Sequence, residues 1–323
     1  MSITGARWLL LVWSLNLKFV QTSPGDRSIW HAQCTEKCMS KFQCPGQFGT
    51  FDWVMGDCFW CRYDCMWETV ELFESNYGIV PQFHGKWPFL AIPLPYGLVI
   101  QEPASLLFSL LNLFSVFLML RRLKKIRDLP NRKMWILYAH VGLVAWISSS
   151  LFHMADCDIT EKLDYFGAFA FVLSALYVSF VFTLPQLEFT AKGRLVLKAA
   201  PFIFIIIFLN HVKNMNNHFD YGYNMTLCIS FSLITTCLYL YYLFQRKRLH
   251  GELLQSDILL IRLIVWANLS TGLELLDFAP VFWVFDSHSL FHLATFPIPV
   301  WWADFLEQTY HSPVLQRSVL KIA

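Results

Sequence analysis

SSSLFHMAD, residues 148–156, places polar and ionisable side chains inside a long apolar run, where a membrane boundary is expected. A second stretch of this kind, DSHSLFH, occupies residues 286–292. Ser149 and His153 are four residues apart, as are His288 and His292, so in helices each pair lies on one face about one turn apart. Three imidazoles can therefore converge, and three protein ligands with an open fourth position are typical of catalytic zinc.

Each of these histidines also has a simpler interpretation. A single His near the end of a helix is usually an interfacial or hydrogen-bonded residue. The topology derived below places all three on the same side of the membrane, and this shared placement favours the metal site.

The composition is that of a polytopic membrane protein. Of the 323 residues, 56% are hydrophobic and 17% aromatic, and the mean hydropathy is +0.44. Such a chain is too apolar for a soluble domain, and its charges cluster between apolar segments. The net charge of +2 carries little information by itself, and no charge pattern indicates a nucleic-acid partner.

Residues 1–22 are typical of a cleaved signal peptide. Arg7 precedes an apolar core that Lys18 interrupts, and we expect cleavage between Thr22 and Gly25. A signal anchor is the alternative, although the stretch is short for a membrane span. The segment that follows is then lumenal or extracellular, where thiols oxidise.

Six of the nine cysteines crowd into residues 34–65, with the spacing C-x3-C-x5-C-x13-C-x2-C-x3-C. In a cytosolic protein Cys58-x2-Cys61 would suggest a zinc or redox site, but the secretory context favours three disulfides, whose pairing stays open. C-x3-C fits one face of a helical turn. We therefore expect residues 23–97 to form a lumenal Cys-rich module, helical and stapled by disulfides, with a Gly- and Pro-rich linker into the membrane.

We expect an all-α membrane protein, with seven transmembrane helices in one domain over residues 98–306. The apolar segments lie at 104–120, 134–153, 163–183, 199–212, 225–243, 257–276 and 288–306. Several are shorter than the roughly 20 residues of a typical span, so their ends are approximate.

Basic residues cluster in alternate loops, at 121–133, 192–198 and 246–248, whereas the intervening loops are acidic or neutral. Loops rich in Lys and Arg usually stay on the cytosolic side. The N-terminus is therefore predicted to be lumenal, and the tail, residues 307–323, cytosolic.

This orientation gathers polar residues from three segments at one depth. Ser149 and His153 come near the lumenal end of the second segment, Asp164 at the lumenal start of the third, and His288 and His292 at the lumenal start of the seventh. Ionisable residues at such a depth usually face the bundle interior and mark function, because facing lipid costs several kcal/mol. A position at the level of the headgroups is the alternative for His288.

Two carboxylates are candidate partners for the imidazoles. Glu274 and Asp277 lie near the lumenal end of the sixth segment. Metal-bound histidines usually donate their other N–H to a carboxylate or a carbonyl. For Asp277 a solvated helix end is the simpler interpretation.

Taken together, Ser149-x3-His153, Asp164 and His288-x3-His292 resemble the signature of the membrane hydrolase superfamily that includes alkaline ceramidases and adiponectin/progestin receptors. The resemblance implies that His153, His288 and His292 bind Zn²⁺. It also implies that Ser149 and Asp164 sit beside the water that zinc activates.

Within that superfamily, further stretches resemble the branch that remodels the lipid of GPI-anchored proteins. These stretches are the Cys-rich module and residues 82–89, 101–105 and 271–278, and the match covers about residues 26–306. The resemblance implies a multi-pass enzyme of the Golgi membrane, phospholipase A2-like and zinc-dependent, that removes the sn-2 acyl chain of GPI anchors. Its partners would be GPI-anchored proteins, their phosphatidylinositol lipid and membrane lipids.

An ester at the lipid interface suits zinc, which polarises a carbonyl and lowers the pKa of its water to about 7. We expect Asp164 to take the proton of that water and return it to the leaving alkoxide. Ser149 would donate a hydrogen bond to the water or to the developing oxyanion. Ser149 as a covalent nucleophile ranks lower, because a metal-coordinated imidazole cannot also be its base.

Two other classes of protein remain open. One is a seven-span lipid-sensing receptor or accessory factor in which the zinc is structural. The other is a transporter or proton relay, which would need ionisable residues leading to the cytosolic side.

Overall fold

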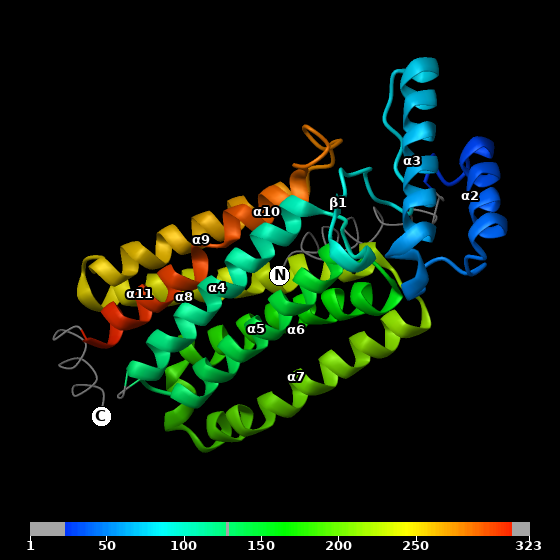
Figure 1. Cartoon of the computed structure of the whole chain (residues 1–323). Helices are drawn as coiled ribbons and strands as arrows, with labels where there is room; N and C mark the ends of the chain where they lie inside the picture. The colour runs from blue at the N-terminus through cyan, green and yellow to red at the C-terminus, as the bar shows by residue number, and fades with distance from the viewer. Residues whose placement is uncertain (1–22, 127–128, 312–323) are drawn as a thin grey trace, which may run out of the picture. The chain divides into compact units, whose positions relative to one another are not determined.

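A computed structural model describes residues 23–126 and 129–311 of the chain. The predicted signal peptide, residues 1–22, and the part of the predicted tail from residue 312 onward lie outside the described residues. The chain divides into two compact units, one ending at Pro88 and the other beginning at Phe89 (Figure 1).

The first unit is a helical hairpin. Its elements are α2 (Ile29–Phe42), the short 3₁₀ helix η1 (Phe51–Trp53) and α3 (Gly56–Tyr77). Ser28 begins α2 by accepting a hydrogen bond from the backbone N–H of His31, which satisfies one of the free donors of the first turn. Gln43 ends α2, and Gly78 ends α3, in the left-handed conformation that commonly terminates helices.

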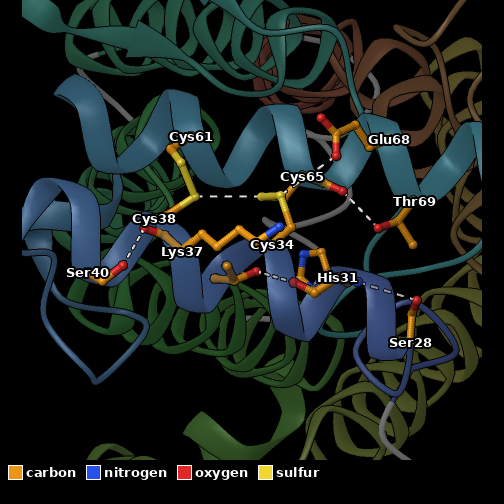
Figure 2. The surroundings of a disulfide bond; sticks show 11 residues. Ser28, His31, Cys34, Lys37, Cys38, Ser40, Cys61, Cys65, Glu68 and Thr69 are labelled. Atoms are coloured by element: carbon orange, nitrogen blue, oxygen red, sulfur yellow. Dashed lines mark hydrogen bonds between the residues drawn. A yellow bond between two sulfur atoms is a disulfide. The ribbon is translucent and has the colours of Figure 1, made fainter.

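Three disulfides form in this unit, as the sequence predicts, and the structure supplies their pairing: Cys34–Cys65 and Cys38–Cys61 join α2 to α3, and Cys44–Cys58 joins the segment just after α2 to α3. Figure 2 shows two of these bonds between facing turns of α2 and α3. The pairing is nested because the helices are antiparallel, so a C-x3-C pair on one helix meets a C-x3-C pair on the other in reverse order. So small a hairpin has little apolar core, and covalent bonds compensate for that.

The second unit begins with a short hairpin and continues as a bundle of helices. The hairpin pairs β1 (Ile92–Pro93) with β2 (Val99–Ile100) in antiparallel fashion across η2 (Pro95–Gly97). The bundle elements are α4 (Pro103–Lys125), α5 (Arg132–Met154), α6 (Asp158–Thr183), η3 (Pro185–Phe189), α7 (Ala191–Asn217), α8 (Tyr221–His250), α9 (Gln255–Glu274), α10 (Ser287–Thr295) and α11 (Ile298–His311).

Six of these helices, α4 to α9, are long and apolar enough to cross a membrane. They contain the first six predicted segments almost entirely, which confirms a multi-pass, largely helical membrane architecture. α7 exposes large apolar side chains such as Phe202, Ile203 and Ile206. A contiguous apolar surface of this kind is expected where a helix faces lipid.

The seventh predicted segment, residues 288–306, is not one helix. α10 ends at Thr295 and α11 begins at Ile298, because Pro297 has no backbone N–H and its ring disfavours a continuous helix. Among the described residues the count of long spanning helices is therefore six, and the prediction of seven is not confirmed. Both short helices pack against α4 and α9.

One end of the bundle is held by ion pairs. The Arg122 guanidinium of α4 lies 2.6 Å from Asp304 and 2.6 Å from Glu307, both on α11. Arg246 of α8 pairs with the buried Asp257 of α9 at 3.1 Å. Arg122 lies near the C-terminal end of α4, about 28 Å along the helix from its start at Pro103.

Replacing Cys38 and Cys61 together by Ala should lower the free energy of unfolding of the α2–α3 helical hairpin by about 2–4 kcal/mol. Without the disulfide the unfolded chain regains the entropy of an open loop. Limited proteolysis of the full-length protein in membranes measures this loss. The matched control replaces Cys228 and Cys237 of α8, which are free thiols. Equal protease resistance of the two variants would contradict a stabilising role for the disulfide.

Candidate metal centre

The structure brings the three predicted metal ligands together. His153 lies in the last turn of α5, and His288 and His292 lie one turn apart on α10. The Nε2 atoms of His153 and His288 are 3.4 Å apart, and the candidate ligand atoms of all three rings lie within 4.8 Å of one another. His153 and His292 are buried, whereas the His288 side chain is 33% exposed, so the cluster is accessible from its His288 side.

Local hydrogen bonds position the two helix ends that carry these rings. Asp286 caps α10 by accepting from the backbone N–H of Ser289 at 2.8 Å, and the Ser289 hydroxyl accepts from the backbone N–H of Asp286 at 3.0 Å. This reciprocal capping box orders the first turn, which carries His288. At the end of α5, the carbonyl of His153 accepts from the backbone N–H of Glu102 at 3.0 Å.

Each imidazole is hydrogen-bonded through its Nδ1 atom to a side chain of another helix or helix cap. Glu102 Oε2 lies 2.7 Å from Nδ1 of His153, and Glu274 Oε2 lies 2.8 Å from Nδ1 of His288. The hydroxyl of Ser109 lies 2.9 Å from Nδ1 of His292. With all three Nδ1 atoms engaged in this way, the three Nε2 atoms are the ones available to a metal ion.

The donor set fits zinc. Neutral imidazole nitrogens are favoured zinc ligands, and three of them leave a fourth position open. Glu102 and Glu274 supply negative charge just outside the rings, an arrangement that raises the basicity of metal-bound histidines. The described residues hold one other group of possible ligands, Cys38, Cys61 and Cys65, but disulfide bonds occupy these sulfurs.

Ser149 lies beside this cluster on α5. It is 5% exposed, and its hydroxyl oxygen is 3.1 Å from that of Ser109, which in turn contacts His292. Ser149 is therefore linked to a candidate metal ligand through one intervening hydroxyl.

Asp164 lies half-buried in the second turn of α6. Gly167, one turn further along α6, packs so closely on α5 that a β-carbon there would crowd the backbone of Ala145. The helices run antiparallel, so Asp164, one turn nearer the start of α6 than Gly167, lies at the same end of this helix pair as Ser149 and His153.

Sequence reasoning identified Glu274 as a partner of an imidazole but missed Glu102 and Ser109. A signal for both was present. In the largely apolar sequence of α4, Glu102, Ser105, Ser109 and Asn112 recur at intervals of three or four residues, and they are all buried. A polar stripe of this kind on an apolar helix indicates a face turned to polar groups inside the bundle.

Comparisons with known proteins find relatives along nearly the whole chain. Relatives include the GPI-specific phospholipase A2-like PGAP3 of Mus musculus, 33% identical over 313 residues, which cover 92% of each chain. The protein of the same name from Danio rerio is 36% identical over 280 residues, 85% of this chain and 84% of the relative. Post-GPI attachment to proteins factor 3 of Drosophila melanogaster is 30% identical over 314 residues, 90% of each chain.

No solved structure matches the chain. The Per1-like family matches residues 49–310, which include most of the second unit and all three clustered histidines. This match and the near full-length relatives establish that the chain belongs to the Per1-like family.

Proposed function

We propose that this protein hydrolyses the sn-2 acyl ester of GPI-anchor lipids. The observation that carries the proposal is the convergence of His153, His288 and His292, each held through Nδ1, beside the buried hydroxyl of Ser149. The names of the relatives, GPI-specific phospholipase A2-like PGAP3 and post-GPI attachment to proteins factor 3, supply the substrate class.

His153, His288 and His292 would hold a zinc ion. The chemistry that such an ion supplies is polarisation of an ester carbonyl and a lowered pKa, about 7, for a water molecule at the site. Glu102 and Glu274 keep the rings of His153 and His288 oriented and their Nδ1 atoms protonated.

The remaining steps belong to Ser149 and Asp164. Asp164 accepts a proton from the attacking water and returns it to the sn-2 oxygen as the C–O bond breaks, which releases a fatty acid and a lyso-lipid. Ser149 donates a hydrogen bond to the carbonyl oxygen while negative charge develops on it. The 33% exposure of His288 supports entry of the lipid ester from that side.

The arrangement of the helices supports a lumenal site and a seventh crossing. α10 begins beside His153, and α11 carries Asp304 and Glu307 to Arg122, so the two short helices together extend along most of α4. Basic residues end α4 and α8 at the opposite end of the bundle from the histidines. We assign this basic end to the cytosol, with the N-terminus lumenal and the C-terminus cytosolic, in the Golgi membrane.

The orientation is testable with protease in sealed microsomes. A cleavage site inserted between Asn131 and Arg132 should be cut by protease added outside, because this loop is cytosolic in the proposed topology. One inserted after Gly46, in the disulfide hairpin, should be cut only after detergent is added. The opposite pattern would place the histidine cluster on the cytosolic side and contradict the assignment.

Alanine variants of the three histidines should lose both zinc and hydrolysis, because two protein ligands hold the metal poorly. Ser149→Ala and Asp164→Asn should keep zinc while turnover falls by about 10²–10⁴-fold, the usual contribution of a positioned acid or base. Zinc content and fatty-acid release from a GPI lipid in vesicles, both measured on purified protein, give the result.

His140→Ala is the matched control, since His140 is an exposed residue on α5. It should retain both zinc and activity. Full activity in Asp164→Asn or in a ligand variant expressed at normal level would refute the hydrolase proposal. A lipid-sensing receptor or accessory factor with a structural zinc would then replace it.

A further inference from the structure

We propose that Ser109 of α4 is a positioning residue that sets two groups at once. It orients the ring of His292, and it aligns the hydroxyl of Ser149 as a hydrogen-bond donor toward the substrate. The second half of this inference rests on the proposed function, and the first half does not.

The position of the proton on His292 sets the direction of the hydrogen bonds around it. A neutral imidazole that binds metal through one nitrogen carries its proton on the other. Nδ1 of His292 lies 2.9 Å from the Ser109 hydroxyl. The Ser109 oxygen can accept a hydrogen bond, so this contact is consistent with a protonated Nδ1 and an Nε2 that is free to bind metal.

The direction of the next hydrogen bond follows. Because Nδ1 of His292 donates, Ser109 cannot donate to it, and the hydroxyl hydrogen of Ser109 is available to the Ser149 oxygen 3.1 Å away. Ser149 then accepts from Ser109, and its own hydrogen is free to point elsewhere. Ser149 shares a helix face with His153, so this hydrogen can reach an oxygen held at the histidine cluster.

This direction distinguishes the two roles considered for Ser149. A nucleophilic Ser149 would pass its proton through Ser109 to Nδ1 of His292. That transfer needs Nδ1 unprotonated and the ring proton on Nε2, which would remove His292 from the metal. The hydrogen bond from Ser109 to Ser149 therefore favours Ser149 as a hydrogen-bond donor that stabilises charge on the ester oxygen. It disfavours a covalent acyl–Ser149 intermediate.

α4 holds Ser109 and the neighbouring His292 in place. Ser109 and Asn112 are completely buried, and the Asn112 side-chain amide donates to the backbone carbonyl of His292 at 2.7 Å. The Trp146 ring packs edge-on against the His292 ring, with the centroids 5.1 Å apart. His292 is therefore held at its backbone by Asn112 and at its ring by Trp146 and Ser109, and we assign to the Ser109 contact the choice of which ring nitrogen carries the proton.

Ser109→Ala tests the inference in the full-length protein, and Ser115→Ala is the matched control. Ser115 is another buried serine of α4, 3% exposed, whose hydroxyl has no hydrogen-bond partner among the described residues. Zinc affinity, measured by competition with a chelator and without substrate, should weaken by about 10–100-fold in Ser109→Ala, the usual cost of losing a partner of a metal ligand. It should stay unchanged in Ser115→Ala.

The alignment of Ser149 by Ser109 is tested at saturating zinc. Ser109→Ala should lower kcat by about 10–100-fold with KM unchanged. In a Ser149→Ala background the same substitution should change kcat by no more than about twofold, because the hydroxyl through which it acts is gone.

Three results would overturn the proposal or part of it. Equal zinc affinities of Ser109→Ala and Ser115→Ala would exclude the orientation of His292. A kcat loss of the same size with and without Ser149 would exclude action through that hydroxyl. A wild-type protein that binds zinc and hydrolyses no GPI lipid would refute the proposed function, and with it the role of Ser109 in aligning Ser149. The zinc affinities of the variants would still decide whether Ser109 orients the ring of His292.

Discussion

The hydrogen bonds at the three Nδ1 atoms are the constraint on which the rest of the site depends. Imidazoles buried at the end of an apolar bundle are costly unless both ring nitrogens are satisfied, and a buried unpaired polar group costs about 1–3 kcal/mol. Glu102, Glu274 and Ser109 satisfy the outer nitrogens of the rings. The inner nitrogens then lie close together, and a single shared cation, as proposed, would satisfy them all.

This constraint explains why two features that look irregular belong together. α4 carries a polar stripe because it supplies partners to His153 and His292, which come from two different helices. The seventh apolar segment breaks at Pro297, so α10 can place His288 and His292 at the site while α11 takes its own path to Arg122. A continuous helix would tie the direction of the histidine pair to that of the whole span.

Local periodicity accounts for what could be predicted from the sequence. The spacing of four residues in Ser149–His153 and in His288–His292 predicts shared helix faces, and the cysteine spacing predicts disulfides; both expectations depend only on neighbours along the chain. The pairing of the cysteines and the roles of Glu102 and Ser109 depend on which helices lie side by side, which no local pattern encodes. Pro297 was visible in the sequence, but the apolar residues around it suggested an uninterrupted span.

X-ray absorption at the zinc edge of the purified full-length protein in lipid tests the central claim most directly. The account predicts one zinc per chain, with three imidazole nitrogens at about 2.0–2.1 Å and one oxygen that exchanges with solvent. A protein without stoichiometric zinc would contradict it. So would a zinc shell that contains sulfur or is closed by four protein ligands.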